Sequence, residues 1–551
     1  MKNRHLRIFP ALALVLAVSA TAQSATAPPK RPRLILTLVI DQFRADYLTR
    51  FEKEFLPARN ASGVGGFRYL MTEGAYFPSA QYEIMQSMTG PGHATILSGS
   101  YPYQSGIPIN DWFDQTTQEK VYCTEDQASA TVGAAPKDAH VGTSPKNFNG
   151  STVGDELKNA GYPSKVVSLA LKDRAAILMG GHRPDLVIWF DTDAHQWVSS
   201  RYYLPDGNLP EWLVKLNESI KTQTASFTWT NPKGTGSGFS ATTEFSHEAK
   251  IGSKSGTATP SGLELTEQAA EQALEAFQMG RGKATDLLAV SFSSHDYVGH
   301  IYGPNSREAE EMTLAEDRLI SKLLNRVRSK IPGGLKEVVV VLTGDHGIPP
   351  SPEYAQANRT PGGRIDESAL VQAISSHLDE KFGKLRHGAK WVPFFHDLNF
   401  FLNHSAIAEK KLDLATVQAE AKVTILSHDP VGTKYVVTSA EYEAKKLPPG
   451  IFEKQILHTF YPGRSADLAI IPKPFFTVKM DAAANHLTGY AFDRTVPLVI
   501  AGGSVRPDIY PQIVNVVDVA PTLSFMGGTV APALSEGRVL SEIFGGNSRS
   551  R

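Results

Sequence analysis

Cysteine is almost absent from this chain, whose 551 residues include only Cys123. A single cysteine cannot form an intramolecular disulfide, so the fold must rest on its packed core rather than on covalent crosslinks. Cys123 lies in the sequence VYCTED, which contains no basic side chain that would activate a thiol. We therefore interpret Cys123 as a structural residue.

Neither sign of charge dominates, because 55 Lys and Arg residues face 56 Asp and Glu residues. This balance argues against a general nucleic-acid binder or membrane-surface binder. Long apolar runs are also missing beyond the N-terminus, so no later stretch predicts a membrane-spanning helix. The hydrophobic content of 41% and the charged content of 20% are ordinary for a soluble globular protein. The length allows more than one compact unit.

The N-terminus is typical of a secretory signal peptide. Lys2, Arg4 and Arg7 make a basic start, Ile8–Ala20 is a short apolar run, and a small-residue cleavage site ends at Ala22. The alternative, a membrane anchor, is disfavoured because the run is short for a bilayer. We therefore expect an exported protein, periplasmic or secreted, without membrane attachment once residues 1–22 are removed.

Leu34–Ile40 (LILTLVI) is a continuous apolar run that ends at Asp41. Strands without polar alternation are typical of sheets covered by helices on both faces, and open α/β sheets bind ligands at the carboxyl ends of such strands. Three further runs also end at chargeable residues, which indicates one functional edge of one sheet. The other predicted strands are Lys165–Leu171, Asp286–Phe292, Glu337–Thr343 and Leu498–Ala501.

Helical segments alternate with these strands, at Thr152–Asn159, Ser261–Met279 and Ser306–Ile331. This alternation predicts a doubly wound α/β fold. Two stretches interrupt it, and we expect them to be insertions that form a lid and a small α+β cap. The predicted organisation is a signal peptide (1–22), a linker (23–33), three core segments (34–190, 261–348 and 479–551), a first insertion (191–260) and a cap insertion (349–478).

The least ordinary stretch is Gln81–Trp112, which contains Thr89 just before a tight Gly90-Pro91-Gly92 turn. Proline suits the first helical position. Thr89 is therefore expected at or just before a helix N-terminus, where an anion such as phosphate is favoured. Without the rest of the chain, an ordinary N-cap or loop threonine is the simpler interpretation.

Three aspartates and three histidines are expected at the functional edge. A spacing of four places Asp296 and His300 on one helical face, and Asp345 precedes His346 at a strand end. Each pair alone could be ordinary surface or capping residues, but the full set predicts two metal sites. Mixed imidazole and carboxylate ligands favour zinc over calcium or magnesium. The set is Asp41, Asp296, His300, Asp345, His346 and His486.

Two zinc ions about 4 Å apart would stabilise the attacking and leaving oxygens of a phosphoryl transfer. A zinc-bound Thr89 hydroxyl would ionise and act as the nucleophile. Lys172 and Arg174, two apart at a predicted strand end, are expected on one side of the chain, where their charge suits a phosphate monoester. Asn110 could donate a further hydrogen bond. Solvated surface cations and a turn asparagine are the alternatives for these three residues.

Several short sequences around these residues resemble the alkaline phosphatase superfamily. They are most similar to the exported bacterial alkaline phosphatases with a threonine nucleophile, the PafA and PhoK type, in the same order over nearly the whole mature chain. Phosphodiesterase relatives share the metal ligands and the threonine but lack the Lys–Arg pair, so Lys172 and Arg174 point to monoesters. The sequences are PGH (91–93), HDYVGH (295–300), GDHG (344–347) and HLTGY (486–490).

The resemblance implies a fold and a role for each site residue. It implies an alkaline-phosphatase-like sheet, with Thr89 as nucleophile and not the nearby Ser87. Asn110, Lys172 and Arg174 would hold the phosphoryl oxygens. One zinc would be bound by Asp41, Thr89, Asp345 and His346, and the other by Asp296, His300 and His486.

The sequence therefore predicts a zinc-dependent alkaline phosphatase that releases inorganic phosphate from small phosphate monoesters through a phosphothreonine. Two alternatives stay open. One is a phosphodiesterase or nucleotide pyrophosphatase on the same scaffold, for which Lys172 and Arg174 would be dispensable. The other is a non-catalytic metal or phosphate binder. Nucleic acid is not expected as a partner, a monomer is favoured, and the acidic loops allow additional structural calcium or magnesium without identifying a site.

Overall fold

A mixed eleven-stranded sheet forms the centre of the computed structural model, which describes residues 30–61, 63–134, 142–223, 225–230, 244–478 and 481–544. The strand order is β22-β4-β21-β14-β1-β13-β8-β9-β10-β7, with β23 paired to β4. The strands are β1 (Leu34–Ile40), β4 (Gly74–Gln81), β7 (Thr131–Val132), β8 (Val166–Ala170), β9 (Leu186–Asp191), β10 (Gln196–Ser200), β13 (Asp286–Phe292), β14 (Val338–Gly344), β21 (Thr495–Gly502), β22 (Asp508–Ile509) and β23 (Val514–Asn515).

The middle of the sheet is parallel. Strand β1 pairs in parallel with β13 and β14, and β8 pairs in parallel with β13. The carboxyl ends of these four strands therefore meet at one edge, as predicted. Strand β21 runs antiparallel to both β14 and β4, so its carboxyl end at Gly502 lies at the opposite edge of the sheet. The expected α/β fold is confirmed, with an antiparallel side that the apolar runs did not reveal.

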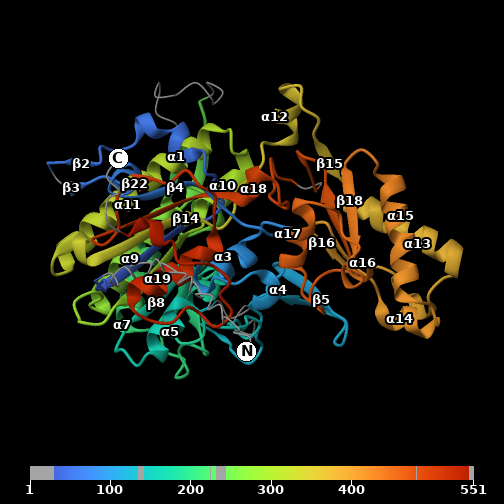
Figure 1. Ribbon diagram of the computed structural model, residues 1–551, viewed down its shortest axis with the longest axis horizontal. Coiled ribbons are helices and arrows are strands. Elements are labelled where there is room, and N and C mark those ends of the chain that lie inside the picture. The colour runs from blue at the N-terminus through green and yellow to red at the C-terminus, as the bar shows by residue number, and fades with distance from the viewer. Residues whose placement is uncertain are drawn as a thin grey trace, which may run out of the picture.

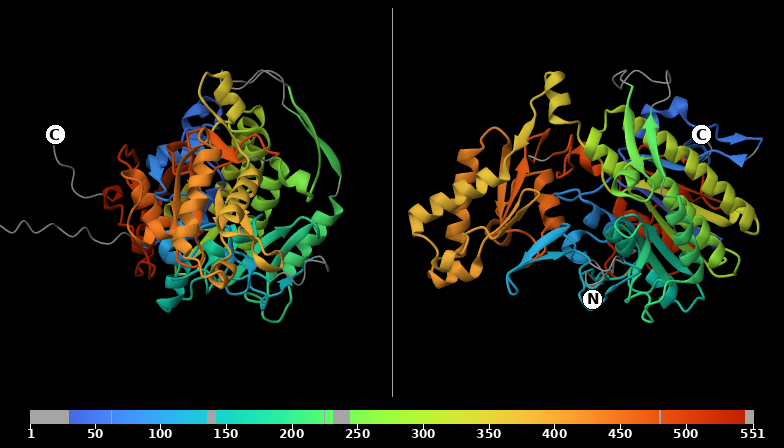
Figure 2. Two further views of the ribbon diagram at one scale, coloured as in Figure 1. Left: turned by 90° about the vertical axis from the view of Figure 1, so that its right-hand side faces the viewer. Right: turned by 180° about the vertical axis from the view of Figure 1, so that it is seen from behind.

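Alternate side chains of β1 enter two different cores, because successive residues of a strand point to opposite faces. Leu36 and Leu38 pack with Leu263 of α9 (Pro260–Ala276) and Leu323 of α11 (Arg307–Lys330). Ile35 and Val39 pack on the other face with α3 (Thr89–Ser98), α5 (Val153–Asn159) and α19 (Val519–Gly527). Figure 1 shows the second layer toward the viewer, and the reversed view of Figure 2 shows α9 and α11. Helices thus cover both faces.

A second lobe, made by residues within 349–478, lies beside the sheet (Figure 1). Its four-stranded sheet has the order β16-β17-β19-β18, and its core is continuous with residues that follow α3, including Ile107 and Trp112. The lobe therefore packs beside the predicted nucleophile region. Its main elements are β16 (Phe394–His396), β17 (Asn399–Phe401), β18 (Thr433–Thr438), β19 (Leu468–Pro472), α13 (Glu367–Phe382), α15 (Leu414–His428) and α17 (Ile451–Thr459).

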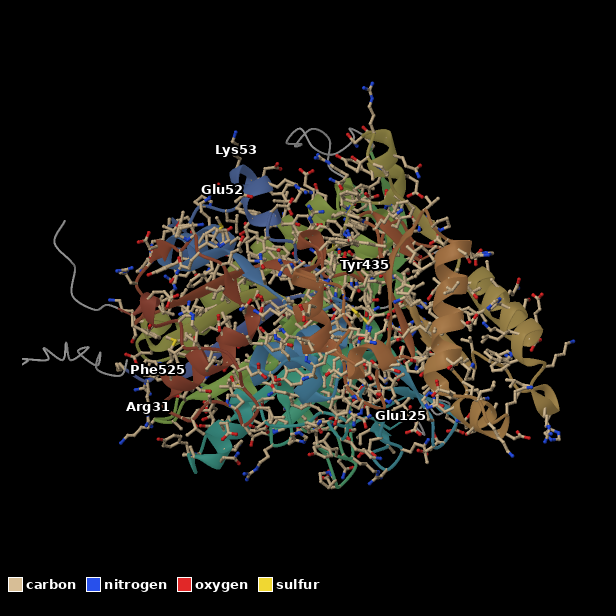
Figure 3. All side chains as sticks on the ribbon, turned by 45° about the vertical axis from the view of Figure 1, so that its right-hand side comes forward. Arg31, Glu52, Lys53, Glu125, Tyr435 and Phe525 are labelled. Carbon is tan, nitrogen blue, oxygen red and sulfur yellow. The ribbon has the colours of Figure 1, made fainter. Side chains whose placement is uncertain are left out.

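Within residues 191–260, β10 extends the central sheet, and the hairpin β11 (Ser226–Thr230)–β12 (Ser246–Lys250) runs along the outside of the molecule (Figure 2). Charged side chains such as Glu52 and Lys53 project from the surface, whereas Tyr435 lies partly buried on β18 (Figure 3). No helix among the described residues has the length and apolarity needed to cross a membrane. The predicted signal peptide lies outside the described residues.

The remaining helices and strands complete the described chain. They are α1 (Tyr47–Arg50), η1 (Glu52–Glu54), β2 (Arg59–Asn60), β3 (Gly63–Val64), α2 (Phe67–Glu73), α4 (Pro102–Ser105), β5 (Asp111–Asp114), β6 (Glu119–Tyr122), α6 (Asp173–Gly180), α7 (Glu211–Thr222), α8 (Lys254–Thr257), α10 (Ser294–Tyr302), η2 (Gly334–Glu337), α12 (Pro352–Ala357), β15 (Gly363–Ile365), η3 (Arg386–Gly388), α14 (His404–Glu409), α16 (Ser439–Glu443), β20 (Phe476–Val478), α18 (Ala491–Arg494), η4 (Val516–Asp518) and η5 (Ser541–Ile543).

Candidate active site

Helix α3 begins at Thr89, which is 1% exposed, so the predicted position of this residue at a helix N-terminus is correct. Pro91 is the third helical residue rather than the first, because the helix starts two residues earlier than the glycine–proline turn indicates. The Gly90 backbone N–H donates to Asn110 Oδ1 at 2.8 Å. This bond uses the Asn110 oxygen, so its amide nitrogen can still act as a donor.

Ser87, the other hydroxyl near the helix start, is turned away from the site. Its Oγ donates to the backbone oxygen of Thr488 at 3.0 Å and is fully buried. Thr89 Oγ1 instead accepts a hydrogen bond from Lys172 Nζ at 3.3 Å. The geometry therefore favours Thr89 over Ser87 as the hydroxyl that faces the charged residues.

Three buried carboxylates converge at the carboxyl edge of the sheet. Asp41 follows β1 and Asp345 follows β14, while Asp296 lies in the first turn of α10, just after β13. Burial raises the pKa of Asp41, and the nearby charge of Asp345 raises it further. Three carboxylates this close and this deeply buried need compensating positive charge. Groups whose ligand atoms lie within 4.8 Å of one another are Asp296–His300–His486, Asp41–Asp296–His346 and Asp41–His93–Asp345.

The histidine rings are oriented as metal-binding histidines are. In His300, His346 and His486 the Nδ1 atom faces a backbone oxygen and must carry a proton to donate to it. The Nε2 atom is then unprotonated, and its lone pair is available to a metal ion. The Nε2 atoms of His300 and His486 lie 3.2 Å apart, and Asp296 Oδ1 lies 3.2 and 3.3 Å from them. These atoms are all acceptors, so a cation fits between them. The Nδ1 contacts are His300 to Ala484 O (3.0 Å), His346 to Gly347 O (3.0 Å) and His486 to Ser87 O (2.7 Å).

A second cluster of acceptors surrounds His346. Its Nε2 lies 3.4 Å from Asp41 Oδ1 and 3.2 Å from Asp345 Oδ2, and no described residue makes a hydrogen bond to this nitrogen. Burial lowers the pKa of His346 to about 3, so the ring is a neutral ligand rather than a counter-ion. The donor set of two carboxylates and one imidazole fits a zinc-like cation. Because Asp41 and His346 also group with Asp296, the assignment of each residue to one ion stays a prediction.

Lys172 is the buried cation of the site. Its Nζ lies 2.7 Å from Asp41 Oδ2 and 2.6 Å from Asp296 Oδ2. Burial alone would lower the pKa of Lys172, but the charges of Asp296 and Asp41 raise it above its ordinary value. The ammonium group therefore stays charged next to the Thr89 hydroxyl.

The prediction that Lys172 and Arg174 lie on one side of a strand end is wrong. Strand β8 ends at Ala170, Lys172 caps α6, and Arg174 lies in the first turn of that helix. Arg174 Nη1 donates to the Tyr122 hydroxyl at 3.2 Å, and this hydroxyl donates to Asp173 Oδ1 at 2.7 Å. Lys172 and Arg174 therefore lie at the start of a helix rather than on one face of a strand. The contact between Arg174 and Tyr122 is not predicted by the sequence.

His93 was also missed as a member of the site, although the PGH sequence contains it. Its Nδ1 lies 3.1 Å from Asp345 Oδ2 and 2.9 Å from the Thr89 backbone oxygen. Its Nε2 lies 2.8 Å from Ser291 Oγ on β13. This fully buried ring links helix α3 to a candidate metal ligand, and its signal was a histidine one turn after Thr89.

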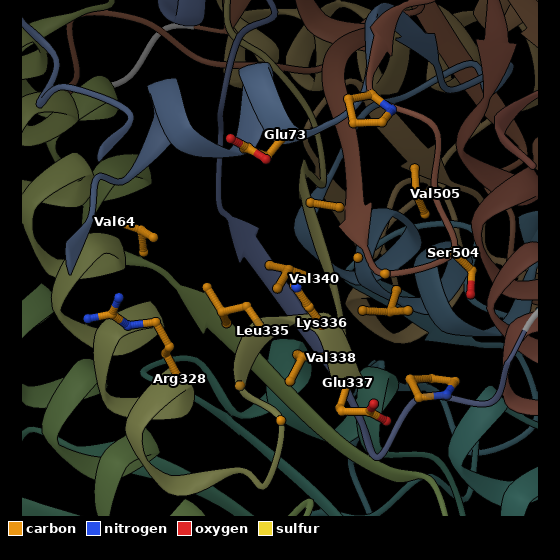
Figure 4. Close-up of a pocket in the computed structure, with 18 of the residues that line it drawn as sticks. Val64, Glu73, Arg328, Leu335, Lys336, Glu337, Val338, Val340, Ser504 and Val505 are labelled. Carbon is orange, nitrogen blue, oxygen red and sulfur yellow. The ribbon is translucent and has the colours of Figure 1, made fainter. Parts of the chain in front are cut away.

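A separate hollow of about 700 Å³ lies at the other edge of the sheet, at the amino end of β14 and the carboxyl end of β21 (Figure 4). Arg328, Lys336, Glu73 and Glu337 lie around it. None of the predicted site residues lines this hollow. The converging residues at the carboxyl edge are therefore the candidate active site.

Comparison with known proteins gives consistent matches. A family model described as type I phosphodiesterase / nucleotide pyrophosphatase matches residues 35–489. The chain is 30% identical to the alkaline phosphatases PafA of Elizabethkingia meningoseptica and PhoV of Synechococcus elongatus, in each case over 97% of this chain and 98% of the relative. It is also 30% identical, over 92% of this chain and 95% of the relative, to a Myroides odoratus protein named calcium-transporting ATPase. The crystal structure of wild-type PafA has a TM-score of 0.82 and 28% identity, covering 94% of this chain and 99% of that one.

Proposed function

The chain belongs to the type I phosphodiesterase / nucleotide pyrophosphatase family of the alkaline phosphatase superfamily and is a metal-dependent phosphatase, and we propose that it is zinc-dependent and specific for phosphate monoesters. The observation that supports this most is the position of Lys172. Its ammonium group lies 3.3 Å from Thr89 Oγ1, where a phosphoryl group would be attacked. A monoester carries more negative charge than a diester, so a buried cation there favours monoesters.

The proposed reaction has two displacements. The Thr89 hydroxyl gives up its proton, Oγ1 attacks phosphorus and forms an O–P bond, and the ester P–O bond breaks with its electron pair leaving on the alcohol oxygen, which takes up a proton. Water then attacks the phosphothreonine, releases inorganic phosphate and restores the hydroxyl. Lys172, Arg174 and Asn110 hold the non-bridging oxygens by charge and hydrogen bonds. The N-terminus of α3 adds a partial positive charge behind Thr89.

Two zinc ions, when bound, would stabilise the charge that develops on the attacking and leaving oxygens. We propose that Asp41, Thr89, Asp345 and His346 hold one ion and that Asp296, His300 and His486 hold the other. The orientation of the three imidazoles, each with Nδ1 on a backbone oxygen, supports this assignment.

The deciding measurement is the ratio of kcat/KM for an aryl phosphate monoester to that for the matching diester, on the zinc-loaded protein. We expect a ratio well above one, which falls in Lys172→Ala and Arg174→Ala because monoester hydrolysis loses more. A ratio below one would favour the second candidate, a phosphodiesterase, which the family description supports. ATP belongs in the same panel because one relative is named an ATPase.

Substitution of the proposed nucleophile gives an independent test. Thr89→Ala is expected to lose more than about 100-fold in kcat, because no hydroxyl is left to form the phosphothreonine. Thr95→Ala is the matched control, since it removes a buried hydroxyl from the same helix whose hydrogen bond goes to Pro91 O. Turnover near the wild-type rate in Thr89→Ala would contradict the assignment.

We also propose that the enzyme is exported as a monomer, with residues 191–260 and 349–478 as its two insertions. The apolar N-terminal run and the small residues before position 23 support export. The N-terminal sequence of the protein recovered from periplasm or medium is expected to begin at Gln23. A protein recovered there with Met1 intact would contradict signal cleavage.

A further inference from the structure

Gln42, which follows Asp41, has a backbone conformation that glutamine rarely adopts. Its φ is 68°, in the left-handed region, and its side chain is fully buried. For a residue with a Cβ atom this conformation is unfavourable, because Cβ comes too close to the carbonyl oxygen. Such strain persists where the surroundings over-determine a residue, and it gathers at functional sites.

The contacts of Gln42 reach both candidate metal clusters. Its side-chain Nε2 donates to Asp296 Oδ1 at 2.7 Å, and its backbone N–H donates to Asp345 Oδ1 at 2.9 Å. Asp296 Oδ1 is also the oxygen that faces the Nε2 atoms of His300 and His486. One residue therefore holds a carboxylate from each cluster.

Helix α10 leaves space for this side chain. Gly299 lies between the two candidate ligands of the helix, Asp296 and His300, and a methyl group on it would lie 1.6 Å from Gln42 Oε1. A glycine inside a helix is less favourable than an alanine, because it loses more conformational freedom on folding. The chain thus contains both a strained glutamine and a glycine inside a helix. The missing side chain at Gly299 provides the space that the Gln42 amide occupies.

We propose that Gln42 is a positioning residue that fixes the rotation of Asp296 and Asp345 and so sets the geometry between the two metal sites. The inference rests on the proposed two-metal function. A carboxylate held by a donor on one oxygen presents its remaining lone pairs in a defined direction. The Gln42 amide leaves Asp296 Oδ1 facing the histidines and Oδ2 facing Lys172. Partners of metal ligands typically account for 10–100-fold in metal affinity.

The first experiment measures zinc affinity by competition with a chromophoric chelator. Gln42→Gly removes the amide that holds Asp296, keeps the backbone N–H that holds Asp345, and relieves the strain of the positive φ, so a loss is assigned to the missing amide. Gln118→Gly is the matched control, because Gln118 also has a positive φ, 59°, but is exposed in the turn between β5 and β6. We expect 10–100-fold weaker zinc binding in Gln42→Gly and no change in Gln118→Gly. Wild-type affinity in a folded Gln42→Gly would overturn the proposal.

A double-mutant cycle tests the partnership with Gly299. Gly299→Ala alone is expected to weaken zinc binding, because the methyl group displaces the Gln42 amide. In Gln42→Gly the space is free, so adding Gly299→Ala is expected to change zinc affinity no further. Losses that add in the double variant would overturn the proposal. If Gly299→Ala does not fold, the absorption spectrum of cobalt-loaded Gln42→Gly gives the second readout, and a spectrum identical to wild type would count against it.

These readouts separate the inference from the proposed function. Normal zinc binding by the wild-type protein together with preferential diester turnover would refute the monoester assignment. The proposed positioning role of Gln42 would not be affected by that result. Wild-type zinc affinity in Gln42→Gly, with monoester turnover intact, would refute the positioning role alone.

Discussion

The Tyr122 hydroxyl connects two charged side chains at the edge of the site. It accepts from Arg174 Nη1 and donates to Asp173 Oδ1, so it bridges the guanidinium and the carboxylate. Burial raises the pKa of Tyr122 well above its ordinary value, so the hydroxyl keeps its proton and its role as donor. Arg174 is thereby held by a neutral group, as its proposed role in binding phosphate requires.

Tyr122→Phe is therefore expected to raise KM for a phosphate monoester by about tenfold, with a smaller change in kcat. A hydrogen bond to a charged group contributes roughly 1.5–3 kcal/mol, and part of it acts on ground-state binding. Tyr103→Phe is the control, because its hydroxyl also bonds to a carboxylate, Glu536, at an exposed position. Equal kinetics in both variants would show that Tyr122 does not orient Arg174.

Asp493 is a buried acid whose ionisation affects stability. It accepts hydrogen bonds from Thr488 N and Oγ1, and its backbone oxygen accepts from Gly347 N, so it ties the segment after His486 to the turn after His346. Burial raises the pKa of Asp493 to about 8 from an ordinary value of 3.8, despite these hydrogen bonds. The folded protein therefore keeps a proton that the unfolded chain releases.

The sign of the pH effect follows from proton binding. Between about pH 4 and pH 8 the folded state binds more protons at Asp493 than the unfolded state, so its contribution to stability falls as pH rises. Asp493→Asn removes this contribution, and we expect a shallower decline in the free energy of unfolding from about pH 5 to pH 8. Urea denaturation across this range measures it, and identical slopes in the two proteins would contradict the assignment.

Helix α3 packs closely against the end of β14, and this close approach depends on Gly92. A methyl group at Gly92 would lie 2.4 Å from the Asp345 backbone oxygen, which cannot move without moving the strand end. Thr89 and a candidate metal ligand are therefore placed by direct contact between two elements. The distance between them is a property of the packing, not of either residue alone.

Gly92→Ala is expected to lower the free energy of unfolding by about 1–3 kcal/mol, the usual effect of overpacking. Gly92→Ala is also expected to lower the zinc content, because the added methyl group pushes α3 and the end of β14 apart and so displaces Asp345. Gly282→Ala is the matched control, since a methyl group there has its nearest atom at 3.9 Å. Thermal melting and metal analysis of both variants provide the check. Unchanged stability in Gly92→Ala would mean that α3 does not lie so close to β14.

Elements with continuous apolar runs were predictable from sequence, and contacts between distant elements were not. The strands Leu34–Ile40 and Asp286–Phe292 were predicted residue for residue, because burial on both faces leaves no polar alternation. Lys172 and Arg174 were placed on a strand because the apolar run continues past the last strand residue into the cap of α6. Gln42 and Tyr122 had no signal, since each acts through partners that only the folded sheet brings near.

The candidate metal ligands run from Asp41, near the start of the chain, to His486, near its end. Cations bound there would join β1, β13 and β14 to the segment before β21. Ligand binding to the folded state adds RT ln(1 + [L]/Kd), about 2.7 kcal/mol at 100-fold excess over Kd. Metal binding is therefore expected to stabilise the entire fold and not only to enable catalysis.

Chelation with EDTA is expected to abolish turnover and to lower Tm, and added zinc is expected to restore both. The control is the same treatment of Asp296→Asn/His300→Ala, which lacks ligands of one cluster and is expected to show a smaller Tm shift. A Tm that does not respond to EDTA or zinc in the wild type would show that no structural coupling to metal exists.

Strand β1 is among the first parts of the protein to be synthesised, yet both of its neighbours, β13 and β14, lie at residues 286–344. The next strand along the sheet, β21, is made later still, after His486. A chain growing from its N-terminus therefore holds its first strand unpaired until about half of the chain has been made, and long-range pairing of this kind is slow to form. Fragments that stop before residue 486 lack His486, a candidate metal ligand beside Asp296, so activity is expected only in chains that are synthesised almost to their end.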